Sequence, residues 1–424
     1  MSSRYNDSQN NRPVHYRKSP KGPKWMKWFG IILSIVLAVV VIGGVLILRY
    51  GSHLINLTNY VSDQDVQVVE KAEELPSEAV ETISTEEKEG DIVSESELEV
   101  IHEAMKVPEE KVKEAVKQDE EVYNLLLVGV DRRDKSWNGN SDSMMLVSIN
   151  FNDKRVSVIS LMRDTYVEIP GVGYNKLNNA YARGGGPLLT ATISDMYKVN
   201  LTRYASVDYE NMIQIIDALG GVDMEWTDAE VTVANGYMLD MCNTLGMDVG
   251  PYLLPGGGVY HCGGVQTVAY MRNRYVGNSD YARTERQRYV LTQILKRIKG
   301  MNLAEITNFI TQVLLLITHN LKTSDIWELV SRAPEIINYD IVLDRIPYDG
   351  MYDVIYVNGQ DMLVPHWEDT VLKLHNTIYG DGVASANADN DQEKRMEGND
   401  EFSYDFEDEI LNGNAQEETP FVAD

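Results

Sequence analysis

The alternation of hydrophobic and polar residues predicts three strands near the middle of the chain. Tyr123 to Val130 is a continuous apolar run, which is typical of a strand buried on both faces. Ser143 to Ile149 is a second such run. Arg155 to Met162 follows an Asn–Asp turn and is rich in β-branched residues. These segments predict neighbouring strands that include a hairpin.

Later segments with helical periodicity alternate with short strands, which implies an α/β domain whose sheet is covered by helices. A short helix with a proline in its first turn is also predicted at Pro108–Lys117. The other predicted helices are Pro187–Tyr197, Tyr209–Leu219, Gly264–Tyr270, Tyr281–Ile298, Leu303–His319 and Ser324–Ser331, and the other strands are Arg203–Val207, Val222–Trp226 and Asp340–Ile346.

The longest apolar stretch, Phe29 to Leu48, carries no charged residue. About 20 such residues are enough to cross a hydrocarbon core of roughly 30 Å. The stretch exceeds a typical signal-peptide core, and no clear A-x-A cleavage site follows it. Lysines precede it and an acidic stretch follows, so the positive-inside rule places the N-terminus in the cytoplasm and everything after residue 50 outside. We therefore expect a single-pass type II protein of the cell membrane, rather than a buried core helix at this position.

Charge is distributed unevenly along the 424 residues, whose formal net charge is −27. Residues 51–120 hold 20 acidic and 6 basic side chains, and residues 381–424 hold 14 acidic and 2 basic ones, so the flanks carry most of the acidity. Net acidity argues against a nucleic-acid binder. The expected parts are a basic cytoplasmic N-terminus (1–28), a transmembrane helix (29–48), an extracellular acidic stalk (49–120), a compact domain (121–380) and a disordered acidic tail (381–424).

The cysteines and histidines give little indication of a disulfide, a metal site or a catalytic triad. Cys242 and Cys262 are the only cysteines, and in an exterior domain we favour one disulfide between them over two isolated thiols. The seven histidines show no metal-ligand spacing. No G-x-S-x-G elbow appears, although spacing alone does not exclude a Ser-His-Asp enzyme.

Charged side chains stand at the ends of the predicted strands. Asp131 directly follows the first strand, and Asp142 precedes the second. Two carboxylates at one sheet edge suit Mg²⁺, which takes one or two of them together with phosphate and water oxygens. Arg163 and Asp164 follow the third strand, at the kind of edge where α/β folds bind ligands. Taken singly, each of these residues is more often an ordinary surface or loop residue.

The stretch from Arg272 to Arg288 places five arginines within seventeen residues of an acidic protein. Arg272 and Arg274 share a face only in an extended backbone. Arg283 lies on one helical face with Arg286 and Gln287, beyond a cap at Asn278 or Asp280. Guanidinium groups bind phosphate oxygens in a bidentate manner. We therefore favour a polyanion site over a solvated basic face.

Carboxylates for a divalent cation and several arginines together indicate phosphoryl transfer, because both neutralise charge on a phosphate while a P–O bond breaks. An exterior domain has no ATP supply, so the phosphate donor is expected to be carried by a lipid. The apolar helix at 303–317 is either core or the lining of a pocket for a lipid chain.

The chain from about Tyr123 to Tyr379 resembles the LytR-CpsA-Psr (LCP) domain of Gram-positive envelope enzymes. The resemblance rests on several ordered motifs beside the arginine stretch. They are Leu126-Leu127-Val128-Gly129-Val130-Asp131, Ser141-Asp142-Ser143-Met144-Met145-Leu146, Arg163-Asp164-Thr165-Tyr166-Val167, Lys176-Leu177-Asn178-Asn179-Ala180-Tyr181 and Asp217-Ala218-Leu219-Gly220-Gly221-Val222-Asp223.

This resemblance implies a three-layer α-β-α domain with a central mixed sheet and a long pocket for a polyprenyl chain. It implies transfer of a glycopolymer, such as teichoic acid or capsule, from undecaprenyl diphosphate to peptidoglycan through a new phosphodiester, with Mg²⁺ or Mn²⁺. Asp131 and Asp142 would hold the metal, and Asp280 and Arg286 would orient the arginines or help to activate the acceptor hydroxyl. The diphosphate would be bound by Arg163, Lys176, Arg272, Arg274, Arg283 and Gln287, with Arg163, Asp280 and Arg286 as the catalytic group.

The match has departures, and a second function remains open. Asn140 stands where the family often has an arginine, Met162 replaces a proline, and the segment Asn235–Cys262 lies where the family varies. The alternative to a transferase is a non-catalytic regulator that binds polyprenyl phosphate, a role long ascribed to this family. Direct control of DNA is not expected, because the short cytoplasmic part shows no helix-turn-helix pattern. Diphosphate hydrolysis would be a side activity of the same site.

Overall fold

The structure is a computed structural model that describes residues 58–62, 68–69, 91–107, 121–132, 136–277, 279–357 and 359–380. The basic N-terminus, the apolar stretch at 29–48, the helix expected at 108–117 and the acidic tail lie outside these residues. In the described ranges, no helix combines the length and the apolar character needed to span a bilayer.

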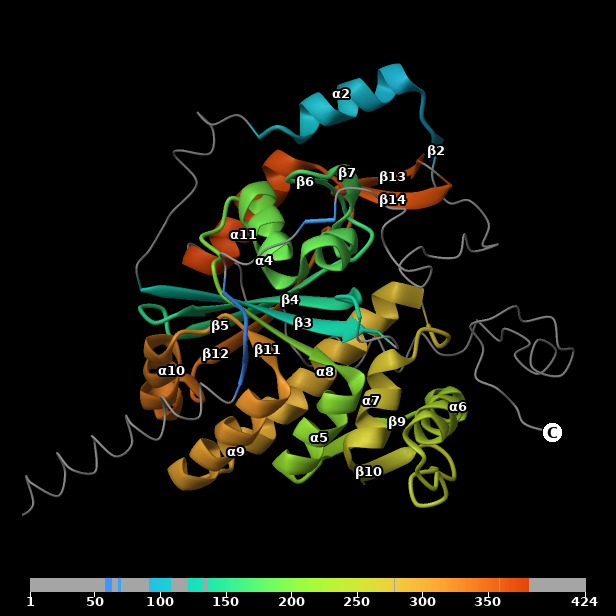
Figure 1. The fold of residues 1–424 in the computed structure, drawn as a ribbon, viewed down its shortest axis with the longest axis vertical. Coiled ribbons are helices and arrows are strands. Elements are labelled where there is room, and N and C mark those ends of the chain that lie inside the picture. Colours follow the sequence, from blue (N-terminus) through green and yellow to red (C-terminus); the bar gives the residue numbers. More distant parts are fainter. Residues whose placement is uncertain are drawn as a thin grey trace, which may run out of the picture. The chain divides into compact units, whose positions relative to one another are not determined.

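Within the described residues, a mixed seven-stranded sheet forms the centre of the domain, in the order β1-β11-β8-β3-β4-β5-β12 (Figure 1). β3 pairs antiparallel with β4 and parallel with β8, while β5 pairs parallel with β12. The strands are β1 (Asn59–Tyr60), β3 (Val122–Asp131), β4 (Asn140–Asn150), β5 (Arg155–Leu161), β8 (Tyr204–Asp208), β11 (Thr318–His319) and β12 (Asp340–Ile346).

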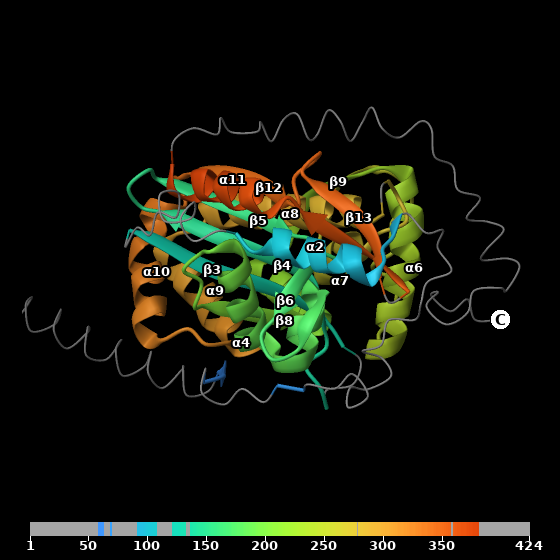
Figure 2. The ribbon, with the colours of Figure 1, turned by 90° about the horizontal axis from the view of Figure 1, so that it is seen from above.

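Helices cover both faces of this sheet, which confirms the expected three-layer α-β-α fold. One face carries α2 (Glu95–Met105), α4 (Leu177–Tyr197) and α11 (Trp367–Tyr379), as Figures 1 and 2 show. The other face carries α5 (Tyr209–Leu219), α7 (Gly264–Arg272), α8 (Ser279–Lys299), α9 (Leu303–Leu316) and α10 (Thr323–Ile336), with α6 (Asp228–Leu245) beside them.

The apolar run that predicted β3 is buried on both sides of the sheet. Leu126 and Val128 belong to the core beneath α4 and α11, whereas Leu127 packs against the cores on the opposite face. α9 contributes Phe309 and Leu314 to the second core, together with α5 and α7. The apolar faces of α9 are thus used at least in part as ordinary core.

Three small sheets complete the described part of the domain. They are the hairpin of β6 (Tyr166–Ile169) and β7 (Gly173–Lys176), the antiparallel pair of β9 (Val222–Trp226) and β10 (Gly258–Cys262), whose strands are separated in the chain by α6, and a sheet of β14 (Gln360–Pro365), β13 (Tyr352–Val357) and β2 (Asp91–Ile92). Of these, only β9 was expected.

α4 and α9 are among the helices whose bounds differ from the predicted ones. α4 begins ten residues before the predicted start, because two helical segments join across non-helical backbone at Gly184 and Gly185. Gly185 has φ +62, and a Cβ at Gly186 would lie 2.1 Å from the Tyr204 ring, so both positions favour glycine. α9 ends at Leu316, and the last two residues of the predicted helix instead pair as β11.

Parts of the segment expected to be a stalk belong to the folded domain. β1 pairs with β11, and β2 pairs with β13. Met105 of α2 is buried in the core beneath α4. The predicted domain start at residue 121 is therefore too late, because short polar segments gained their structure from pairing with strands far along the chain.

Cys242 and Cys262 are both free and buried, so the expected disulfide is wrong. Burial raises the pKa of the Cys262 thiol to about 11, and the indole N–H of Trp226 donates to its sulfur at 3.4 Å. Both thiols serve as small core residues where α6 packs beside the β9–β10 pair.

Candidate functional site

Arg163 lies at the centre of a charged network at one edge of the main sheet. Its Nη1 donates to Oδ1 of Asp142 at 3.1 Å, and its Nε donates to Oδ2 of Asp280, also at 3.1 Å. Asp164 lies 3.5 Å from the same Nε. Arg163 follows β5, Asp142 lies on β4 and Asp280 lies in the first turn of α8, so a distant helix meets two consecutive strands here.

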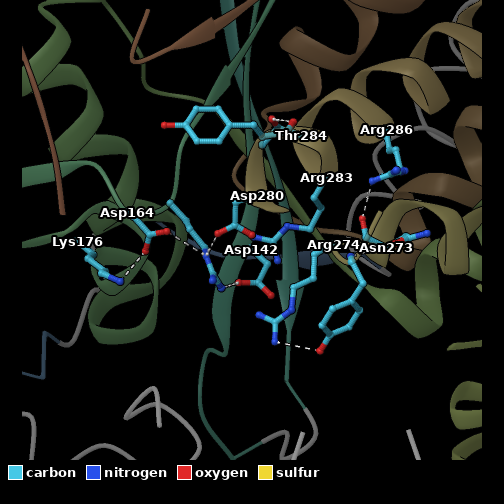
Figure 3. Close-up of polar contacts among 12 residues, drawn as sticks. Asp142, Asp164, Lys176, Asn273, Arg274, Asp280, Arg283, Thr284 and Arg286 are labelled. Atoms are coloured by element: carbon cyan, nitrogen blue, oxygen red, sulfur yellow. Dashed lines mark hydrogen bonds and ion pairs between the residues drawn. The ribbon is translucent and has the colours of Figure 1, made fainter. Parts of the chain in front are cut away.

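Two more cations extend this network on either side. The Lys176 Nζ lies 2.7 Å from Oδ1 of Asp164, and Nη2 of Arg283 lies 3.0 Å from Oδ1 of Asp280. Figure 3 shows Lys176, Asp164, Asp280, Asp142 and Arg283 pointing toward one another. Lys176 and Arg283 are buried. Because the pairs lie largely out of water, their electrostatic coupling is stronger than on an open surface.

The arginines keep the central carboxylates charged. Burial alone would raise the pKa of Asp142, but Arg163 and Arg283 outweigh it and lower that pKa below the ordinary value. For Asp280 burial is likewise outweighed by Arg283, Arg163 and Arg274, so its pKa is also lowered. Both residues are therefore carboxylates at neutral pH and weak proton acceptors.

Asp142 owes its position to a β-bulge. Val130 pairs with Ser141 and Gly129 pairs with Ser143, which leaves Asp142 as the extra residue on β4. A bulge of this kind changes the direction of one side chain at a strand end and is common next to active sites.

Arg272 and Arg274, from the Arg272–Arg288 stretch, lie outside this network and have different partners. Arg274 stands over the Tyr275 ring at 5.3 Å and donates to its hydroxyl at 3.4 Å. Arg272 ends α7, with Nη1 3.7 Å from Oδ2 of Asp240. It lines a hollow with Asp131, Tyr209, Asp240 and Thr244.

Arg286 points away from the charged network and into the protein. Its Nε donates to Oε1 of Glu230 at 3.1 Å, and its Nη groups donate to the carbonyls of Asn273 at 3.1 Å and Val276 at 2.8 Å. Arg286 and Glu230 are both buried. Arg286 thus fixes the loop that carries Arg274, which places it among the positioning residues.

Glu230 was missed from the sequence. Its other carboxylate oxygen accepts from the N–H of Thr227 at 3.0 Å and from its hydroxyl at 3.1 Å, closing a capping box at the start of α6. The Thr-x-x-Glu spacing before an apolar segment was the available signal for this cap. The sequence holds no comparable signal for the pairing of Glu230 with Arg286, which lies 56 positions later. Gln287, expected near the diphosphate, is buried on α8.

The acidic residues fit a metal only in combination with a substrate. Among the described residues, no group of three or more His, Cys, Asp or Glu side chains is arranged to hold an ion. Asp131 pairs with Asn140 on β4, two positions before Asp142, so both aspartates lie at the same sheet edge. Two carboxylates at one edge suit Mg²⁺ or Mn²⁺ when phosphate oxygens complete the coordination.

A family model described as the LytR_cpsA_psr family matches residues 89–373. Biofilm regulatory protein A of Streptococcus mutans is 31% identical over 292 residues, which cover 64% of this chain and 67% of that protein. A polyisoprenyl-teichoic acid–peptidoglycan teichoic acid transferase, TagU, of Enterococcus faecalis is 30% identical over 210 residues, covering 48% of this chain and 62% of that protein.

A solved structure supports the fold. The crystal structure of protein gbs0355 from Streptococcus agalactiae has a TM-score of 0.50 and 22% identity, covering 67% of this chain and 97% of that one. At this level of identity the likeness concerns the fold alone.

Proposed function

Because the chain belongs to the LytR_cpsA_psr family, we propose that it transfers a glycopolymer from an undecaprenyl-diphosphate carrier to peptidoglycan. The relatives named TagU carry this type of activity in their names, with teichoic acid as the polymer. The match covers about three fifths of their length, so the polymer and the acceptor hydroxyl are part of the proposal.

The observation that carries the proposal is the convergence of cations from distant elements at one sheet edge. Arg163, Lys176 and Arg283 come from three parts of the chain, and each is paired with an aspartate. Arg274 lies close enough to help lower the pKa of Asp280. A diphosphate entering here meets preorganised donors, which is the arrangement that stabilises charge as a P–O bond breaks.

The proposed reaction exchanges one P–O bond for another. An acceptor hydroxyl of peptidoglycan attacks the phosphorus that bears the glycopolymer. The new P–O bond completes a phosphodiester, while the bond to the bridging diphosphate oxygen breaks and undecaprenyl phosphate leaves. The hydroxyl proton passes to solvent or to the departing phosphate. With water in place of the acceptor, the same site would hydrolyse the diphosphate.

In this scheme Asp280 and Arg286 position the arginines that bind the diphosphate. The lowered pKa of Asp280 makes it a poor base but a good partner for Arg163 and Arg283. Arg286 acts through the loop that holds Arg274. Asp131 and Asp142 would hold Mg²⁺ or Mn²⁺, which when bound would supply charge neutralisation on the phosphate oxygens.

The proposed substrates imply a place in the cell. A polyprenyl-linked donor and peptidoglycan meet at the outer face of the cell membrane. The apolar stretch at 29–48 would anchor the chain there, with the catalytic domain outside.

A transfer assay with the full chain in detergent tests this function. The protein is incubated with undecaprenyl-diphosphate-linked glycopolymer, peptidoglycan and Mg²⁺, and polymer bound covalently to sedimented peptidoglycan is measured. We expect transfer by the wild type and a loss of about 100-fold or more in Arg274→Ala, because one charge-stabilising donor is removed. Arg297→Ala, an exposed arginine near the far end of α8, is the matched control. Near-normal transfer by Arg274→Ala would refute the assignment.

The second candidate is a regulator that binds polyprenyl phosphate without turnover. The name of the Streptococcus mutans relative, Biofilm regulatory protein A, favours this alternative. A wild-type protein that binds the lipid in a separate binding measurement but attaches no polymer to peptidoglycan in this assay would support regulation over transfer.

A further inference from the structure

The antiparallel pair of β13 and β14 contacts both sides of the charged network. On one side, a backbone N–H of β14 donates to the carbonyl of Asp164 at 2.9 Å. On the other side, the hydroxyl of Tyr352 on β13 lies 2.7 Å from the hydroxyl of Tyr281 on α8. Asp164 directly follows Arg163 in the chain. Tyr281 likewise follows Asp280. The strand pair is therefore attached next to both members of the Arg163–Asp280 ion pair.

A second contact holds Tyr281 from the side of β12. The Arg345 guanidinium lies 4.4 Å from the centre of the Tyr281 ring, and Arg345 also pairs with Asp349 in the turn before β13. Tyr281 and Arg345 are both partly buried, so this cation–π contact is stronger than one in open water. The segment 345–352 thus holds both the ring and the hydroxyl of Tyr281.

The first turn of α8 depends on contacts of this kind. The first four backbone N–H groups of a helix have no partner within it, and helix ends fray. This turn carries Asp280, and Arg283 pairs with Asp280 at 3.0 Å. A shift of the turn would therefore displace both side chains relative to Arg163. A displacement of about 1 Å can lower the rate of an enzyme about 100-fold.

The tyrosine hydroxyls are suited to holding this turn and not to moving a proton. Burial raises the pKa of Tyr281, and the hydrogen bond to Tyr352 raises it further. The Tyr281 hydroxyl therefore stays protonated at neutral pH. It remains a hydrogen-bonding group on the side of the helix turn that faces β13.

We propose that Tyr352 is a positioning residue of the charged site. Its hydroxyl holds the first turn of α8 through Tyr281, and this turn places Asp280 opposite Arg163. The contact of β14 with the backbone of Asp164 holds the other side, so the strand pair sets the spacing between the two. This role rests on the proposed function, because the positioned groups act on the donor diphosphate.

Steady-state transfer by the full chain in detergent tests this role. Rates are measured against the concentration of undecaprenyl-diphosphate-linked glycopolymer at saturating peptidoglycan. The kcat is expressed per molecule that binds undecaprenyl diphosphate, as counted by calorimetry, so that loss of folded protein does not affect it. Tyr352→Phe keeps the ring and loses the hydroxyl. We expect its kcat to be about tenfold lower and its KM to stay within about twofold of the wild type, because the positioned charges act in the transition state.

Tyr281→Phe removes the other half of the same hydrogen bond. The double variant should therefore lose no more activity than either single variant, because residues that act through one bond are not additive. Tyr260→Phe is the matched control. The Tyr260 hydroxyl donates to the carbonyl of Gly256 at 2.8 Å, and this tyrosine is also partly buried, on β10. The control should keep the kcat of the wild type.

Three outcomes would overturn the role of Tyr352 alone. They are a wild-type kcat in Tyr352→Phe, an equal loss in Tyr260→Phe, and additive losses in the double variant. A wild type that transfers no polymer would overturn the proposed function and this role with it.

Discussion

Arg163 holds together carboxylates that would otherwise repel one another. Asp142, Asp164 and Asp280 all lie within 3.5 Å of its guanidinium nitrogens. Like charges at such distances raise each other's pKa unless a cation lies between them. The ionisation of the site is therefore a property of the whole group of side chains.

Replacing Arg163 with glutamine should make stability depend on pH in a new way. In the wild type the pKa of Asp142 is lowered, so its contribution to stability is present above the unfolded pKa of about 3.9 and is lost as pH falls through the folded pKa. Without Arg163, Arg283 is left to offset burial, so that pKa rises and the charged form contributes less stability at neutral pH. The difference in melting temperature between wild type and Arg163→Gln should thus be largest near pH 7 and should narrow toward pH 4.

Thermal unfolding followed by circular dichroism across this pH range measures the effect. Adding Asp142→Asn to both proteins should remove much of the narrowing, because the titrating group is gone. A difference that stays constant with pH in the single variant would show that Arg163 acts through packing rather than charge.

Among the elements, α6 and α8 are joined through one buried carboxylate. Glu230 caps α6 through Thr227 and pairs with Arg286 of α8, which in turn holds the carbonyls of the loop at 273–276. The α6 cap and the Arg274 loop therefore depend on the same side chain.

Glu230→Gln should destabilise the fold by about 3 kcal/mol, because it leaves the buried Arg286 charge without its carboxylate partner. Thr227→Ala removes only a helix cap and should cost about 1 kcal/mol. Urea unfolding of both variants gives the comparison. Equal losses would mean that the cap, and not the ion pair, accounts for the role of Glu230.

The sequence predicted the elements whose pattern is local. α5, β9 and β12 have the predicted bounds, because each is a periodic or alternating segment between clear turn signals. The arginine stretch and the strand-end residues were also found from spacing. The sequence did not indicate which arginine faces which partner, because Arg286 turns inward through contacts with Glu230 and with two loop carbonyls. It also missed β1 and β2, which are two residues long and depend on pairing with distant strands.

For the molecule as a whole, the segment before the main domain forms part of the fold. Besides the β1–β11 pairing, the N–H of Val61 donates to the carbonyl of His319 at 2.9 Å. Val69 and Arg183 exchange two hydrogen bonds, one from the backbone N–H of Val69 and one from the Arg183 side chain. The β1 and Val61 contacts cover the edge of β11, whose backbone groups would otherwise be unpaired on that side, and the Val69 contacts join the segment to α4.

Val61→Pro should therefore loosen this edge. Proline lacks the N–H that His319 accepts, so we expect faster amide exchange in β11 and a stability loss of about 1 kcal/mol. Val61→Ala keeps the N–H and is the control. Hydrogen exchange measured by mass spectrometry on the full chain compares the two. Equal exchange rates in both variants would show that the edge is held by side chains alone.

The bulge at Asp142 also limits which changes in length the chain can tolerate. Asp142 is the extra residue between two paired positions of β4, so its direction is set by one surplus residue in the backbone. Deleting Asp142 would restore the regular alternation of side chains along β4 and remove the bulge. Insertions or deletions in the connection at 132–139 would leave that register intact. Related chains can thus differ in the length of this connection while the strand segment at the bulge keeps a fixed length.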